Sequence, residues 1–180
     1  MALLTEVDFG TPKVTANKQV TLTVDGTDIS VPEGTSVMRA AAEAGIKIPK
    51  LCASDNLNAF GSCRLCVCTI EGKRGTPASC TTPVENGMNV VTKNDQITKI
   101  RKGVMELYLS DHPVDALSKP GAKESEFFKM IEETGVVSVR YGLAGDSHLN
   151  SVVDDTNPYF VFDESFVRSL VGNLLSKIVL

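Results

Sequence analysis

The segment CASDNLNAFGSCRLCVC, residues 52–68, together with Cys80 holds all five cysteines of this 180-residue chain. Residues 1–51 and 81–180 contain none. The start of the chain lacks the pattern of a secretory signal, because Glu6 and Asp8 stand where such a signal needs basic residues followed by an apolar run. An odd number of clustered cysteines without export indicates a metal or redox site in a reducing cytoplasm rather than a disulfide scaffold.

The spacing of four of these cysteines, C-x10-C-x2-C-x13-C, narrows the kind of site. They are Cys52, Cys63, Cys66 and Cys80. Four thiolates bind either a tetrahedral zinc ion or an iron-sulfur cluster. Structural zinc often takes two C-x-x-C pairs, whereas one such pair with a single cysteine on each side is typical of plant-type [2Fe-2S] sites. The spacing favours a [2Fe-2S] cluster and leaves a four-cysteine zinc site, in a structural or docking module, as the alternative.

The residues around these cysteines suit a negatively charged group. Gly61 and Ser62 let the backbone wrap closely before the C-x-x-C pair. Cys68 follows Cys66 by two positions on an expected strand, and we interpret it as a small buried hydrophobe, with a spare ligand as the less favoured alternative. From position 47 to position 80 basic residues exceed acidic ones, with Lys47, Lys50, Arg64, Lys73 and Arg74 against Asp55 and Glu71.

Composition excludes several other classes of protein. The 18 basic and 22 acidic residues give a net charge of −4, and no basic tract supports binding of nucleic acid or of an anionic membrane surface. No run of about 18 apolar residues occurs, so we expect no membrane span. A chain of 180 residues builds one core with an appendage, which excludes a large enzyme carrying its own bulky cofactor domain.

Patterns outside the cysteine segment predict an α+β fold. Alternating apolar residues around an Asp-Gly turn predict a β-hairpin, helical spacing of alanines predicts a short helix, and further short runs bounded by Gly or Pro predict strands. The expected elements are strands at 19–24, 27–31, 67–71, 76–81 and 88–92 and a helix at 37–44, capped by Thr35 or Ser36 and ended by Gly45.

The pattern becomes helical after residue 94. Apolar residues share one face of an expected helix that ends near 111, and a second helix is expected over 123–134, stopped by Gly135. Residues 136–160 show no regular pattern. A wide apolar face then recurs at Phe166, Leu170, Leu174 and Ile178, which we interpret as a helix packed on the rest of the chain, with a partner-binding helix as the alternative.

Several motifs together resemble a known family. The residues that carry the resemblance are 48–52 (IPKLC), 60–66 (FGSCRLC), 74–84 (RGTPASCTTPV), 101–108 (RKGVMELY), 110–113 (SDHP), 140–142 (RYG) and 157–160 (NPYF). They resemble the amino-terminal [2Fe-2S] region of the catalytic alpha subunit of NAD-dependent formate dehydrogenases. Related domains open the large subunit of bacterial complex I and several hydrogenases. The resemblance covers most of residues 19–163, and its most specific part surrounds Cys80.

The resemblance implies a fold and a ligand set. The fold is a β-grasp domain like that of plant ferredoxin, followed by a helical extension. The implied divisions are 1–95 for the ferredoxin-like domain, 96–134 for a helical module and 135–180 for an irregular segment with a C-terminal helix. Cys52 and Cys63 would bind one iron of a single [2Fe-2S] cluster, and Cys66 and Cys80 the other. The implied partners are other redox subunits or domains of a formate dehydrogenase-like complex in the cytoplasm.

The chain departs from this family after residue 111. There the relatives bind a [4Fe-4S] cluster through a His-x3-Cys-x2-Cys-x5-Cys motif. His112 is present in this chain, but the three cysteine positions hold Ala116, Lys119 and Ser125. Since none of the three supplies a thiolate, we predict that this second site is empty and that His112 has a structural or vestigial role. His148 is interpreted as a surface loop residue.

These observations predict an electron-transfer protein with one [2Fe-2S] cluster and no catalytic centre of its own. The chain has no G-x-G-x-x-G fingerprint for a dinucleotide and no set of nucleophile, base and orienting group. Formate dehydrogenase is the favoured parent complex, with hydrogenase and complex I as alternatives.

Overall fold

The computed structural model describes residues 7–112, 123, 125–141 and 154–159. The chain divides into two compact units, 1–97 and 98–180, and each is described by itself. The three-part division expected at residues 95 and 134 stays a prediction.

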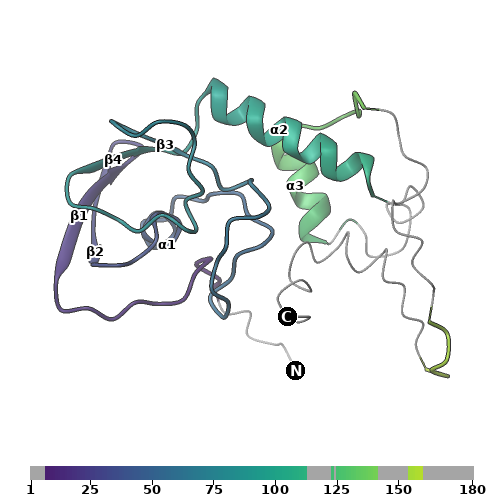
Figure 1. Cartoon of the computed structure of the whole chain (residues 1–180), viewed down its shortest axis with the longest axis horizontal. Helices are drawn as coiled ribbons and strands as arrows, with labels where there is room; N and C mark the ends of the chain where they lie inside the picture. Colours follow the sequence, from purple (N-terminus) through teal and green to yellow (C-terminus); the bar gives the residue numbers. More distant parts are fainter. Residues whose placement is uncertain (1–6, 113–122, 124, 142–153, 160–180) are drawn as a thin grey trace. The chain divides into compact units, whose positions relative to one another are not determined.

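The first unit is built on a four-stranded mixed sheet with the strand order β2-β1-β4-β3 (Figure 1). Strand β1 pairs antiparallel with β2 and parallel with β4, and β3 pairs antiparallel with β4. The strands are β1 (Gln19–Val24), β2 (Thr27–Pro32), β3 (Thr69–Ile70) and β4 (Met88–Val91). The mixed sheet and the helices confirm the predicted α+β fold class.

The hairpin between β1 and β2 closes at the predicted Asp-Gly turn. Asp25 and Gly26 have φ values of 49° and 83°, the left-handed backbone that a two-residue hairpin turn with the right twist requires. The Asp25 N–H donates to the Val90 carbonyl at 2.9 Å, and its carboxylate accepts from the Thr92 N–H at 2.8 Å and from the Thr92 hydroxyl. The turn therefore also anchors the hairpin to the end of β4.

Helix α1 (Val37–Glu43) supplies the other side of the core. Ser36 is its N-cap, accepting from the Arg39 N–H at 3.1 Å, so the second of the two candidate caps is the one used. The alternating apolar residues of the strands and the apolar residues of the helix belong to one buried core. The members of this core that are at most 2% exposed are Leu22, Val24, Val31, Val37, Met38, Ala40, Ala41, Cys66, Cys68 and Val90.

The predicted strand over 76–81 is wrong. Only an isolated bridge between Val67 and Ala78 occurs there, and the strand expected over 67–71 is reduced to β3. Pro77 has no N–H for a ladder, and the Thr81 N–H turns back to the Ala78 carbonyl at 3.1 Å. The segment is therefore a tight turn with one bridge.

The second unit contains most of α2 (Asp95–Ser110) and all of α3 (Glu126–Thr134). The Ser125 hydroxyl caps α3 by accepting from the Phe128 N–H at 3.2 Å, and Gly135 ends the helix with φ 67°. The Glu106 carboxylate, 3% exposed, accepts from Arg140 at 2.6 Å. Residues 136–141 and 154–159 belong to no named helix or strand, and the C-terminal helix expected around 166–178 lies outside the described residues.

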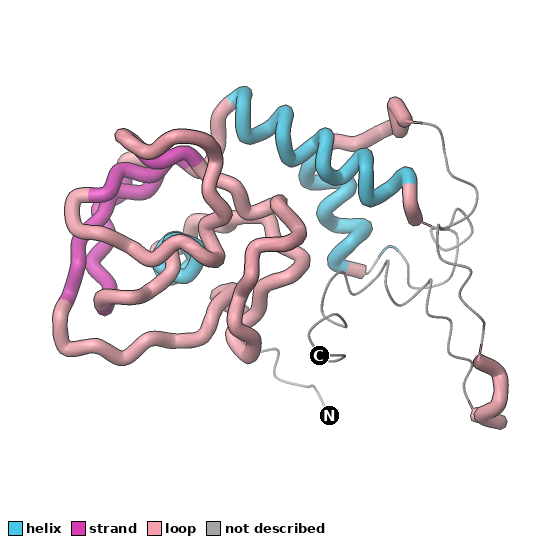
Figure 2. Tube along the Cα trace, in the orientation of Figure 1, coloured by secondary structure: helices cyan, strands magenta, loops and turns pink. Residues whose placement is uncertain are grey.

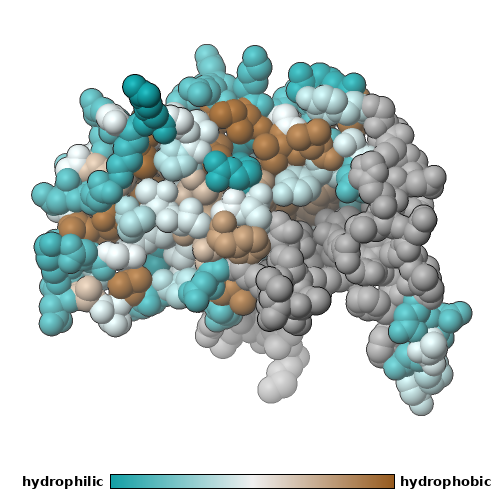
Figure 3. All heavy atoms as spheres, viewed as in Figure 1, coloured by the Kyte–Doolittle hydropathy of each residue, from teal (hydrophilic) through white to brown (hydrophobic). Residues whose placement is uncertain are grey.

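On the face seen in Figure 3, hydrophilic side chains surround separate hydrophobic patches. In the part of the chain that the structure describes, no helix has the length and apolar character needed to cross a membrane.

We expect Leu22→Ala to lower the free energy of unfolding by about 2–5 kcal/mol, because Leu22 is 1% exposed at the centre of the core. Urea denaturation of the metal-free protein measures the loss. Thr21→Ala, a truncation at an exposed position of the same strand, is the matched control and should cost clearly less. Equal losses would contradict the observed orientation of β1.

Candidate metal centre

The cysteines lie on loops that the sheet and helix α1 hold in place. From Ala44 to Cys68 the chain forms a long connection without a named helix or strand, drawn as loop in Figure 2. The second loop, at 77–82, is bonded on two sides. Its Ser79 N–H donates to the Cys66 carbonyl at 3.0 Å, and its Ser79 carbonyl accepts from the Met38 N–H of α1 at 3.1 Å. Backbone hydrogen bonds thus bring Cys80 to Cys66.

The four predicted ligands gather as two buried pairs. The Cys66 and Cys80 sulfurs are 3.4 Å apart, and the Cys63 N–H donates to the Cys52 sulfur at 3.3 Å. All four residues are at most 4% exposed, and all are free thiols. The structure therefore brings the four cysteines of the predicted site together as two pairs, Cys52 with Cys63 and Cys66 with Cys80.

The electrostatics of each pair follows from hydrogen bonding between its members. The Cys63 thiol lowers the pKa of Cys52, and the Cys63 and Ser62 backbone N–H groups act in the same direction against burial. The pKa of Cys63, the other thiol of this pair, is raised by its hydrogen bond to Cys52 and by burial. Likewise the pKa of Cys66 is lowered and that of Cys80 raised by their mutual hydrogen bond. Each pair therefore stabilises one thiolate.

These pairs fit a two-iron group. Two sulfurs bound at about 2.3 Å to one tetrahedral ion lie about 3.7 Å apart, close to the 3.4 Å between Cys66 and Cys80. The pKa of Cys80 is also raised by the charges of Cys52 and Cys63, so the two pairs lie within electrostatic range of each other. Within the described residues no three His, Cys, Asp or Glu side chains converge on one metal position.

The loop between Cys52 and Cys66 depends on a special backbone. Gly61 has φ 70°, and a Cβ there would meet the Ala78 Cβ and the Thr81 Cγ2, both at 3.3 Å. Arg64 has φ 56°, a left-handed conformation that is unfavourable for a residue with a long side chain. Its guanidinium donates to the Thr76 carbonyl at 3.1 Å, which ties the C-x-x-C turn to the second loop.

Ser79, one of the small residues next to the cysteines, contributes a buried polar group beside Cys80. Its hydroxyl is fully buried and makes no hydrogen bond of ordinary geometry, yet it acts with Cys80 to lower the pKa of Cys66. A buried hydroxyl beside a thiolate is a donor that favours negative charge on sulfur.

The expected excess of positive charge is smaller than the sequence window indicated. Lys50 pairs with Asp8 at 2.7 Å and Lys73 with Glu85 at 2.6 Å, and both acids lie outside the window from 47 to 80. The ion pairs arise from the fold and were not visible in the local sequence.

The structure describes three of the remaining candidate residues, Cys68, His112 and Ser125. Cys68 is fully buried in the core of the first unit, as predicted for a small hydrophobe. His112 belongs to the second unit, where it is 3% exposed and its ring stacks on Phe127 with centroids 4.6 Å apart. Ser125, at a position where the resembling family has a cysteine, caps α3. Ala116, Lys119 and His148 lie outside the described residues.

The part of the chain that forms the sheet and the cysteine loops matches a family of iron-sulfur domains. Residues 17–95, which include all five cysteines, match the 2Fe-2S iron-sulfur cluster binding domain family. This match supports the predicted cofactor, one [2Fe-2S] cluster.

Relatives of this chain are subunits of redox complexes. The chain is 45% identical over 108 residues to a subunit of the NADH-quinone oxidoreductase of Streptomyces coelicolor, covering 59% of this chain and 13% of the relative. It is 39% identical over 134 residues to the NADP-reducing hydrogenase subunit HndD of Solidesulfovibrio fructosivorans, covering 72% of this chain and 23% of the relative. The chain thus spans less than a quarter of either relative.

A solved structure shares the fold. The crystal structure of an NAD+-reducing [NiFe]-hydrogenase in the H2-reduced state matches with a TM-score of 0.74 and 25% identity. The match covers 86% of this chain and 63% of the hydrogenase chain.

Gly61→Ala should destabilise the protein more than Gly72→Ala. Both glycines have positive φ, which costs an alanine about 1–2 kcal/mol. Only at Gly61 does the added methyl group also meet neighbours, whereas nothing lies within 4 Å at Gly72. We expect an additional loss of about 1–3 kcal/mol for Gly61→Ala in urea denaturation. Equal losses for the two variants would show that the close approach of the loops is not required.

Proposed function

We propose that this chain is a one-electron carrier in which Cys52 and Cys63 bind one iron of a [2Fe-2S] cluster and Cys66 and Cys80 bind the other. The observation that carries the proposal is the pairing of these four buried thiols within a segment that matches a [2Fe-2S] domain family. When bound, the cluster accepts and releases one electron. A single zinc ion would instead require all four sulfurs around one point.

The residues around the thiols prepare the site for negative charge. Burial excludes water, and N–H groups of the backbone point at sulfur before any metal is bound, so little reorganisation accompanies loading. For Cys52 these donors are the N–H groups of Ser62 and Cys63. For Cys66, the Cys80 thiol is the main group that lowers the pKa, and the N–H of Cys80 acts in the same direction against burial. Such donors stabilise the reduced, more negative state and raise its potential.

The first unit is proposed to be a β-grasp domain that exchanges electrons with other redox subunits of a cytoplasmic complex. Two observations differ on the parent complex. The block at 74–84 favours a formate dehydrogenase, as the resemblance implies. The relatives are named as subunits of NADH-quinone oxidoreductase and of an NADP-reducing hydrogenase. Mass spectrometry of the proteins that copurify with the tagged chain from its native host distinguishes these complexes.

Metal analysis tests the cofactor. Protein purified without oxygen should contain about two irons and two acid-labile sulfides per chain. Its visible absorption should bleach with dithionite, and the reduced form should give a rhombic electron paramagnetic resonance signal. A colourless protein with one zinc per chain would establish the alternative of a structural or docking module.

Cys80→Ala should abolish or severely reduce cluster binding, because it removes a sulfur from the Cys66 pair. Cys68→Ala is the matched control. It removes a buried thiol that belongs to neither sulfur pair, and its absorption and resonance spectra should match those of the unchanged protein. Equal loss of iron in both variants would show that the ligands are assigned wrongly.

A further inference from the structure

The segment that carries Cys52 is fastened at both ends by one carboxylate from the start of the chain. Asp8 accepts from the Lys50 ammonium at 2.7 Å and from the Asp55 N–H at 3.0 Å. The Lys50 ammonium also donates to the Ala53 carbonyl at 3.1 Å, so it joins Asp8 to the backbone next to Cys52. Asp8 further accepts from the Gly10 N–H at 2.8 Å, which sets its own orientation. Cys52 lies between the two attachment points.

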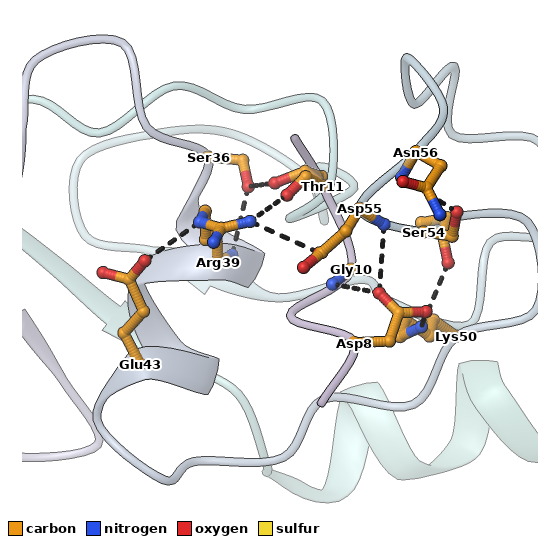
Figure 4. A network of polar contacts seen from close by, with 11 residues as sticks. Asp8, Gly10, Thr11, Ser36, Arg39, Glu43, Lys50, Ser54, Asp55 and Asn56 are labelled. Atoms are coloured by element: carbon orange, nitrogen blue, oxygen red, sulfur yellow. Dashed lines mark hydrogen bonds and ion pairs between the residues drawn. The ribbon is translucent and has the colours of Figure 1, made fainter. Parts of the chain in front are cut away.

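Arg39 makes a second attachment from helix α1 (Figure 4). Its side chain is only 7% exposed and bonds to three groups: the Thr11 carbonyl, the Glu43 carboxylate at 2.9 Å and the Asp55 carboxylate at 3.3 Å. The Phe9 ring covers the guanidinium at 5.0 Å. A buried guanidinium with fixed donors orients its partners more strictly than an exposed ammonium does.

The pair formed by Cys66 and Cys80 is held differently. There the backbone of 66–68 bonds to the backbone of 77–79, through the Ser79 N–H to the Cys66 carbonyl and the Cys68 N–H to the Pro77 carbonyl, both at 3.0 Å. The segment around Cys52 is held by side chains that come from residues far away in the sequence. The segment of Cys52 is therefore held mainly by charged side chains, whereas the Cys66 and Cys80 loops are joined mainly by backbone hydrogen bonds, with one added bond from Arg64.

We propose that residues 8–11 form an N-terminal clasp that positions Cys52 for metal binding, with Asp8 and Arg39 as positioning residues. The inference rests on the proposed role of Cys52 as a ligand. The Asp8 side chain is 41% exposed. A substitution at this position therefore leaves the hydrophobic core closed. Hydrogen bonds from Lys50, Gly10 and Asp55 outweigh burial and lower the pKa of Asp8, which keeps its carboxylate charged at neutral pH.

The first test measures the reactivity of individual thiols in the full-length, metal-free protein. Iodoacetamide labelling followed by mass spectrometry gives a rate for each cysteine. Asp8→Asn should label Cys52 about fivefold faster than the unchanged protein does, because a released segment opens more often. The rate for Cys80 should stay within twofold. Unchanged labelling of Cys52, or equal acceleration at Cys80, would overturn the clasp.

Matched variants separate the clasp from a general effect of charge. Glu33→Gln makes the same carboxylate-to-amide change in the exposed ion pair of Lys18 and Glu33, and it should leave every rate unchanged. Lys50→Met removes the other side of the Asp8 contact and should reproduce the effect of Asp8→Asn. Arg39→Lys keeps the positive charge but loses the planar guanidinium with its several donors. We expect its labelling rate at Cys52 to lie between those of the unchanged protein and of Asp8→Asn.

The second test uses the metal-loaded protein and a readout that loss of stability alone does not move. Asp8→Asn should change the shape of the electron paramagnetic resonance signal of the reduced protein and speed the loss of iron to excess EDTA, while Glu33→Gln changes neither. If the unchanged protein holds no iron but Cys52 still responds to Asp8→Asn in the first test, the proposed cluster is wrong and the clasp stands. If the protein holds two irons and Cys52 does not respond, the clasp alone is wrong.

Discussion

The backbone of residues 77–82 is the part on which the geometry of the site depends, since it is bonded on two sides at once. Through Ser79 it contacts Cys66 on one side and the start of helix α1 on the other, and the Val37 N–H adds a bond to the Thr82 carbonyl at 2.9 Å. Helix α1 in turn packs against β2 and the core of the sheet. The separation between two sulfurs is therefore set by a sheet that carries no ligand.

This arrangement explains why a loop with little regular structure can hold buried thiols. A buried thiolate is unfavourable unless hydrogen-bond donors surround it. The donors here are N–H groups of the same loops, and they point inward only because Gly61 lets two loops approach and Arg64 accepts an unfavourable backbone angle. The unfavourable backbone angle at Arg64 lies between Cys63 and Cys66, one member of each pair, and such strain is often found at functional sites. The regular elements behind the loops compensate for that cost through burial.

How far the sequence predicts this structure depends on the range of the interactions. The hairpin and α1 were predicted because their signals are local, an Asp-Gly turn and alternating apolar residues. The strand over 76–81 was predicted wrongly although Pro77, which has no N–H for a ladder, stands within it, because the bond from the Thr81 N–H to the Ala78 carbonyl is not visible in the sequence. The set of four cysteines followed from their spacing, whereas their division into two pairs was implied only by the family resemblance. The contacts of Arg39 with Thr11 and Asp55 join positions far apart in the chain, and no local pattern marks them.

The described part of the second unit is held by capping, ring stacking and an ion pair. Where the resembling family has a cysteine, Ser125 caps α3, and a serine cap contributes about 1 kcal/mol relative to alanine. His112 packs its ring on Phe127, which is 2% exposed. Glu106 adds an ion pair with Arg140. None of these contacts uses a thiolate, so the helices of this unit are stabilised by capping, stacking and charge. Ser125 therefore acts as a helix cap at a position where the resemblance implies a cysteine, and His112 has a packing role against Phe127.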